Sequence, residues 1–282
     1  MAISNIDTLN TITDTLKTSG GSDSDWILHH VMDGDGIELP FIGNMHLPEW
    51  PTVFGIDITP TKHVIFMWIV AFLVFITFYF VSKGYKSSLI PKRLANFFEV
   101  FIVFVRDEIA VPTLGKAYKP FLPFLLTLFF FILFGNFIGL LPFSATFTSN
   151  IAITASLAII SFLMIQLGGI KNNGFVGYFK GLIPHGMPAW LLPLMIPVEI
   201  LGLFTKPFAL AIRLFANMIA GHIVILALIG LIFFMGTLYV APISIAFAVF
   251  IYLLEILVAL IQAYIFTMLS SLFIGMAVHQ EH

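Results

Sequence analysis

Cysteine is absent from the 282-residue chain, which excludes disulfide bridges and metal sites built on thiolates. Charge is scarce as well: 10% of the residues are Asp, Glu, Lys or Arg, against about 25% in soluble domains. No phosphate-loop motif occurs, so nucleotide chemistry within the chain is not expected. No basic region precedes an early apolar run, so we expect no cleavable signal peptide. We also expect no metal site, no cofactor and no nucleic-acid partner.

What the chain does have is apolar residues, which make up 59% of it and give a mean hydropathy of +1.03. Between residues 121 and 170 there is no charged residue at all. A bilayer crossing needs about 20 apolar residues in a helix. The sequence therefore predicts an all-α polytopic membrane protein. The predicted crossings are at about 63–82, 121–143, 151–169, 189–233 and 241–278, with 121–143 and 151–169 forming a hairpin.

The last two apolar segments are too long for ordinary crossings. A helix of 45 residues reaches roughly 67 Å at 1.5 Å per residue, whereas the hydrocarbon core is about 30 Å thick. Either the helices tilt steeply or they break, and the candidate breaks are Pro193, Pro197 and Pro207. We favour two steeply tilted, kinked helices packed as a hairpin. The alternative is an extra crossing before Lys206.

A further apolar segment, at about 92–111, does not suit a crossing. Its part 94–111 contains Glu99, Arg106, Asp107 and Glu108, and four charges in 18 residues favour an amphipathic helix lying in the interface. The segment 171–188 is rich in Gly, Pro and Asn, and we expect a loop there.

The distribution of charge predicts the orientation. Residues 1–61 form a polar tail that carries nine of the fifteen acidic residues, and 62–282 form the membrane domain. Segments 83–119 and 171–188 hold nine of the thirteen basic residues. Because basic loops stay on the cytoplasmic side, we expect the N-terminus outside and the C-terminus in the cytoplasm. The expected location is the inner (plasma) membrane of a bacterial cell.

A few polar residues lie inside the apolar segments. Glu199, Lys206 and Arg213 are seven residues apart, which places them on one helical face, and Asn217 shares it. Lys206 is close to an expected helix end, where it would snorkel. Arginine stays protonated, and at the centre of a membrane helix it costs about 2.5–3.5 kcal/mol. We infer that the counter-charge of Arg213 comes from another polypeptide or from water.

Folding the last two segments about a turn near position 238 aligns their polar residues. His222 and Glu255 are then equally far from the turn and can touch, while Arg213 and Asn217 fall level with Gln262. A purely structural His–Glu pair, and amides that only join helices, are the alternatives. Since histidine and glutamate pass protons and arginine does not, the pattern favours two proton-accessible regions separated by a fixed cation. Two other classes remain open, a stand-alone proton- or sodium-coupled transporter and a membrane scaffold.

Three stretches carry a family resemblance. They are PVEILGLFTKPFALAIRLFANMIAGHIV (197–224), GNFIGLLPFSATFTSN (135–150) and ALIQAYIFTMLSSLFIGMA (259–277). With these motifs the chain resembles subunit a of the F-type ATP synthases over roughly residues 62–280. The resemblance implies a stator subunit that forms two aqueous half-channels against a ring of c subunits, with the b-subunit peripheral stalk as a further partner. It also implies that the chain makes no ATP by itself.

The resemblance assigns roles by motif position. Arg213 matches the essential arginine that faces the ring carboxylates, and His222 with Glu255 matches a pair that some bacterial members carry in the reverse order. The resemblance also implies that Glu199, Asn217, Gln262 and Asn136 line the half-channels. Gly139 stands where some bacterial members have an aspartate, which leaves the exit route open.

Overall fold

The computed structural model describes residues 36–39, 43–46, 61–87, 94–140, 147–181, 192–235, 239 and 241–279. The chain forms two compact units, and each is considered by itself. One unit comprises Met1–Lys62 and Ile219–Glu255, and the other comprises His63–Met218 and Ile256–His282. Most of the predicted N-terminal tail lies outside the described residues.

The first unit contains a short β-hairpin that the sequence analysis did not predict. Strand β1 (Gly36–Leu39) pairs antiparallel with β2 (Gly43–His46). The unit also holds the end of α9 (Leu192–Met235) from Ile219 and the start of α10 (Ala241–Val278) up to Glu255. The Ser244 hydroxyl of α10 donates a hydrogen bond to the Leu228 carbonyl of α9, which ties the two segments together.

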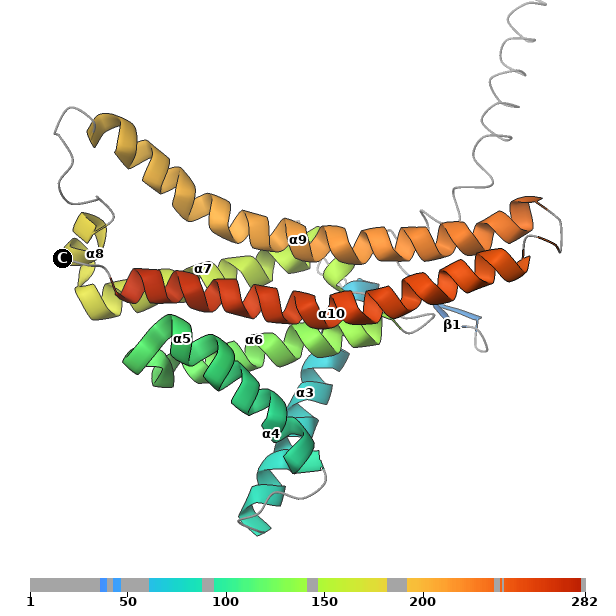
Figure 1. The fold of residues 1–282 in the computed structure, drawn as a ribbon, viewed down its shortest axis with the longest axis horizontal. Coiled ribbons are helices and arrows are strands. Elements are labelled where there is room, and N and C mark those ends of the chain that lie inside the picture. The colour runs from blue at the N-terminus through green and yellow to red at the C-terminus, as the bar shows by residue number, and fades with distance from the viewer. Residues whose placement is uncertain are drawn as a thin grey trace, which may run out of the picture. The chain divides into compact units, whose positions relative to one another are not determined.

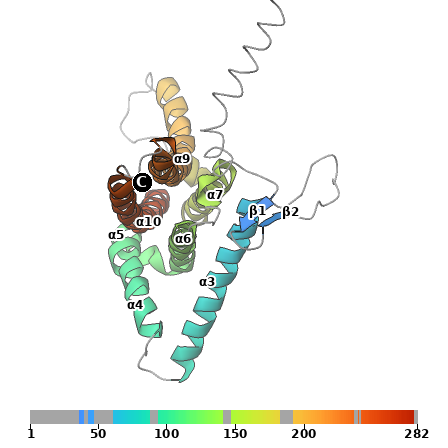
Figure 2. The same cartoon turned by 90° about the vertical axis from the view of Figure 1, so that its right-hand side faces the viewer.

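The described residues of the second unit are helical apart from a few connecting and terminal residues (Figures 1 and 2). It holds the remaining parts of α9 and α10 and most of the helices that precede them. In chain order these are α3 (Lys62–Ser87), α4 (Leu94–Phe104), the π-helix Val105–Ala110, α5 (Val111–Leu114), the 3-10 turn Gly115–Ala117, α6 (Tyr118–Gly139), the 3-10 turn Phe147–Ser149, α7 (Ile151–Asn173) and α8 (Phe175–Gly181).

The predicted helix at 92–111 exists, as α4 continued by the π-helix and α5. At Gly115 the backbone takes a φ of 53°, a left-handed conformation that glycine adopts without strain, and the chain then enters α6. Whether α4 lies in a membrane interface stays a prediction, because the helical run Leu94–Gly139 is also long and apolar enough to cross.

Apolar side chains from α4 to α10 form the core of the second unit. Phe130 is fully buried and its ring lies 4.7 Å from that of Phe78 and 5.9 Å from that of Phe98, measured between centroids. Around this core, polar contacts join α10 to its neighbours. The Thr113 and Ser271 hydroxyls are 2.5 Å apart, and the Asn173 amide donates to the Ala277 carbonyl at 2.9 Å. The second half of α10 is therefore fixed against α5 and α7.

The all-α membrane fold predicted from the sequence is confirmed. Five helical stretches among the described residues are long and apolar enough to cross a membrane. The expected crossings 63–82, 121–143, 151–169, 189–233 and 241–278 correspond to α3, α6, α7, α9 and α10, with ends shifted by a few residues. Pro242 lies in the first turn of α10, where a proline is tolerated because that turn has no intrahelical partner for its N–H.

Helix α9 is one continuous helix, as the favoured interpretation expected, but the expected position of Lys206 near a helix end is wrong. The helix continues through Pro197 and Pro207, so neither proline ends it. Each interior proline removes one backbone hydrogen bond, a loss that helices of membrane proteins tolerate. Lys206 consequently lies well inside the helix instead of near its end. The predicted steep tilt remains a prediction.

The prediction of a loop at 171–188 is also partly wrong. Helix α7 extends to Asn173, and α8 follows after Gly174, whose φ of 71° separates the two helices. The glycines of this segment suggested a loop, but Tyr178 provides a reason for α8 to form there. Its side chain is 1% exposed and belongs to the core of the unit.

Candidate functional site

The first polar site lies in the first unit and consists of His222 on α9 and Glu255 on α10. The His222 Nδ1 atom is 3.7 Å from Glu255 Oε1, as the register about the turn predicted. Glu255 is 4% exposed, and neither of its oxygens has a hydrogen-bond partner among the described residues. A buried carboxylate is costly when charged and unpaired, so the imidazole is placed to compensate it or to exchange a proton with it.

Gly221 makes this approach possible. A β-carbon at this position would overlap the Glu255 carboxylate, and its nearest neighbours would be Oε1 and Cδ. Helix α10 thus brings its acid directly against the backbone of α9. From the sequence, Gly221 is expected to allow close approach of the two helices, and the structure adds that the group packed against it is the Glu255 carboxylate.

The second polar site lies in the second unit. The Asn217 amide on α9 donates to the Gln262 Oε1 atom on α10 at 2.9 Å, which confirms that these residues fall level. Gln262 is 2% exposed, and its Nε2 atom is buried with no hydrogen-bond partner among the described residues. A buried donor normally has a partner, so the two N–H protons of this amide remain available for a water or another group.

Arg213 lies one helical turn before Asn217 and points outward. Leu210, Leu214 and Met218 recur every four residues and are buried, so they define the face of α9 that packs on its own unit. Arg213 lies off this face and is exposed. None of the acidic side chains among the described residues forms an ion pair with it. Its guanidinium is available to a group outside this chain.

Asn136 on α6 is completely buried and its amide is engaged at both ends. Its Nδ2 atom donates to the Ala259 carbonyl of α10 at 3.4 Å, and its Oδ1 atom accepts from the Thr148 hydroxyl at 3.1 Å. Ala259 is three residues before Gln262, so Asn136 is anchored within one turn of the second polar site. These bonds make Asn136 a structural link as well as a predicted channel residue.

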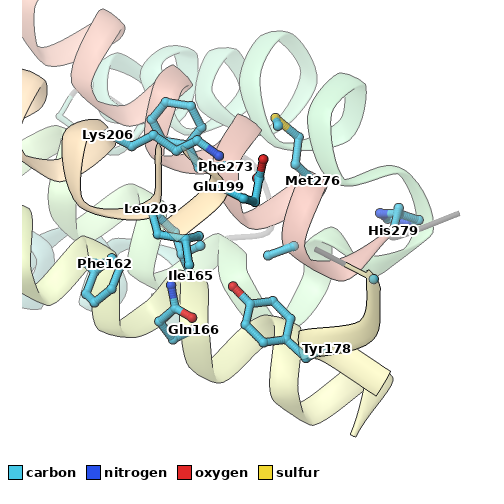
Figure 3. A pocket seen from close by; sticks show the side chains of 12 residues that line it. Phe162, Ile165, Gln166, Tyr178, Glu199, Leu203, Lys206, Phe273, Met276 and His279 are labelled. Carbon is cyan, nitrogen blue, oxygen red and sulfur yellow. The ribbon is translucent and has the colours of Figure 1, made fainter. Parts of the chain in front are cut away.

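A third polar site surrounds Glu199. This residue and Lys206, seven positions later on α9, line a cavity of about 300 Å³ in the second unit (Figure 3). The Lys206 Nζ atom lies 5.3 Å from the centre of the Phe273 ring, within the range of a cation–π contact. The predicted common face of Glu199 and Lys206 is thereby confirmed, but Arg213 does not line the cavity.

Three further polar residues line this cavity and were missed from the sequence, and one of them is His279, which follows α10. Gln166 comes from α7 and Tyr178 from α8. Gln166 is a single polar residue near the end of an apolar segment, and Tyr178 falls within the segment expected to be a loop. The only signal in the sequence was that a glutamine inside an apolar helix needs a hydrogen-bond partner.

The comparisons with known proteins cover most of the chain. The family model described as "ATP synthase A chain" matches residues 64–275. A protein of Chloroherpeton thalassium named ATP synthase subunit a is 52% identical over 260 residues, which is 90% of this chain and 77% of that protein.

Two other relatives carry the same name. One from Myxococcus xanthus is 50% identical over 80% of this chain and 75% of its own length. One from Anaeromyxobacter dehalogenans (strain 2CP-C) is 50% identical over 88% of this chain and 69% of its own length. The match to the family model includes His222, Glu255, Asn217, Gln262 and Glu199. The chain therefore belongs to the ATP synthase A chain family.

Proposed function

We propose that this chain is the stator subunit a of an F-type ATP synthase and that it conducts protons to and from the carboxylates of a c-subunit ring. The observation that carries the proposal is the environment of Arg213. This residue is a permanent cation on an apolar helix, exposed on this chain, and without an acidic partner among the described residues. A charge on a membrane-spanning helix is costly without a counter-charge, and a passing ring carboxylate supplies one.

Arg213 has two tasks in this proposal. It favours the ionised form of the ring carboxylate, so the carboxylate releases its proton when it reaches the arginine. It also repels protons and so prevents direct leakage between the two half-channels. A charge that moves across the membrane potential gains about 2.3 kcal/mol per 100 mV, which is the driving force for rotation.

The other polar residues serve the two half-channels. On the outer path, protons pass Glu255, His222 and Gln262, with Asn217 positioning the Gln262 amide. The ring then turns almost a full circle before the proton leaves on the cytoplasmic path, which Glu199 lines. Asn136 supports the outer path through its hydrogen bond to the Ala259 carbonyl of α10.

The proposed setting follows from the charge distribution. The N-terminus lies outside, the C-terminus lies in the cytoplasm, and the basic segments 83–119 and 171–188 face the cytoplasm of a bacterial cell. The b-subunit peripheral stalk holds this chain still while the ring turns. Membership in the ATP synthase A chain family favours this role over a stand-alone proton- or sodium-coupled transporter.

The test compares Arg213→Ala and Arg213→Lys with the unaltered chain in membrane vesicles that contain the assembled complex. Both variants should lose ATP synthesis driven by an imposed proton gradient, because an ammonium does not reproduce the planar guanidinium. Lys83→Ala, a change in a basic segment, is the control and should retain synthesis. Gradient-driven synthesis in Arg213→Ala would falsify the role of the arginine.

A further inference from the structure

The cavity beside Glu199 has a polar lining although it lies among apolar helices. Its walls come from α7, α8, α9 and the end of α10, and its polar groups are Glu199, Lys206, Gln166, Tyr178 and His279 (Figure 3). It encloses about 300 Å³, which is room for several waters. A cavity of this polarity and size is expected to be hydrated.

Tyr178 is held rigidly at one side of this cavity. Its ring lies so close to Gly169 of α7 that a β-carbon there would overlap Cε2 and Cδ2. In Figure 3 its hydroxyl is directed toward Gln166 and Glu199. Burial raises the pKa of the Tyr178 hydroxyl, the Gln166 amide opposes that shift, and the charge of Glu199 adds to it. The hydroxyl therefore stays protonated and can both donate and accept a hydrogen bond.

Gln166 contributes an unused donor to the same space. Its Nε2 atom is buried and has no hydrogen-bond partner among the described residues. Leaving such a donor unsatisfied is costly, and a water held between polar groups is the usual remedy. Because Gln166 and Tyr178 share the cavity with Glu199, a water bound by them is also within the surroundings of the carboxylate.

We propose that Tyr178 and Gln166 are positioning residues that hold the water through which Glu199 exchanges protons, an inference that rests on the proton-conducting role proposed above. In one transfer, the Glu199 carboxyl gives its proton to a water oxygen. That water passes a different proton to the Tyr178 oxygen, and the hydroxyl releases its original proton to the next water. The phenol ends neutral, as it began, and Gln166 keeps the first water in place.

The charged groups around the cavity affect which species can carry a proton through it. Glu199 and Lys206 come from α9 and His279 follows α10, while the lining residues of α7 carry no charge. Lys206 is placed over the Phe273 ring, and the His279 Nδ1 atom faces the Gly275 carbonyl at 3.3 Å. A positive charge on Lys206 disfavours an excess proton, so ordered waters and a neutral hydroxyl are the available carriers.

The test is Tyr178→Phe, which keeps the ring against Gly169 and removes only the hydroxyl. In inverted membrane vesicles, ATP-driven proton pumping per assembled complex should fall about fivefold, the rate factor for one hydrogen bond of about 1 kcal/mol. The ratio of the pumping rates in H₂O and D₂O should rise, because proton transfer becomes more limiting. Tyr264→Phe is the matched control: Tyr264 is half-buried on α10, does not line the cavity and should show neither change.

Gln166→Leu provides a second, independent variant. It should slow pumping in the same sense, and the double variant Tyr178→Phe/Gln166→Leu should be no slower than the slower single variant, because both act on the same water. Unchanged pumping and isotope ratio in Tyr178→Phe, or an equal loss in Tyr264→Phe, would overturn the inference. Failure of the proposed function would instead appear as coupled synthesis in Arg213→Ala, so the two failures are distinguishable.

Discussion

Gly221 and Glu255 are in contact across two helices, and the missing side chain of the glycine leaves the space that the carboxylate occupies. The acid is almost fully buried there and lies 3.7 Å from the His222 imidazole. Because the site depends on an empty volume as much as on its two titratable groups, a single methyl group is enough to probe it.

Gly221→Ala should displace the Glu255 carboxylate, since the new methyl group and the acid cannot occupy the same space. We expect a loss of stability of about 1–3 kcal/mol from overpacking and a clear loss of ATP-driven proton pumping in vesicles. Gly202→Ala is the matched control on the same helix, because a β-carbon at Gly202 meets no atom within 4 Å. That change should be neutral or slightly stabilising. Equal pumping in the two variants would contradict the steric argument.

Exchanging the two partners tests whether the pair acts as a unit. His222→Glu alone places two acids together, and Glu255→His alone places two imidazoles together, so each should lower gradient-driven ATP synthesis. The double variant restores one acid and one imidazole at the same separation, and we expect it to retain more activity than either single variant. A double variant no better than the worse single variant would mean that position, not pairing, matters.

The sequence predicted this contact because the turn between α9 and α10 fixes the register of the helices. The same count placed Asn217 level with Gln262, and the structure has the two amides 2.9 Å apart. Periodicity also placed Glu199 and Lys206 on one face, and both line one cavity. These relationships depend only on helical geometry and turn position, which a sequence reveals directly.

What the sequence did not reveal depends on packing between segments far apart in the chain. Tyr178 is buried because Gly169 and the end of α10 leave room for its ring, and no local pattern around position 178 signals that space. Local propensity alone could not decide between a continuous α9 and breaks at Pro197 and Pro207; the helix is continuous because lost backbone bonds are tolerated in a membrane helix. Gln166 was missed for the same reason, since its surroundings come from three other helices.

Variants of the Asn217–Gln262 amide pair can separate its contribution to stability from its contribution to proton conduction. Asn217→Leu removes the donor and leaves the buried Oε1 atom of Gln262 unsatisfied, which should cost about 1–3 kcal/mol. Asn217→Leu/Gln262→Leu removes both groups and should regain most of that stability, measured as the thermal transition of the purified complex. Proton pumping should stay low in the double variant if the amides line a half-channel. Recovery of pumping together with stability would assign the pair to helix packing alone.

Gly275→Ala tests how closely α10 must approach α5. A β-carbon at Gly275 would overlap the Thr113 carbonyl oxygen, a backbone atom that cannot move aside as a flexible side chain can. The same contact region includes the hydroxyl pair of Thr113 and Ser271, 2.5 Å apart, so separating the helices also breaks that bond. We expect a loss of about 1–3 kcal/mol or more, seen as a lower thermal transition and less subunit in the membrane. Gly177→Ala is the control, because its β-carbon would meet the Asn173 Cβ at an ordinary 3.8 Å. If Gly275→Ala is as stable as that control, the close contact is not needed to hold α10 in place.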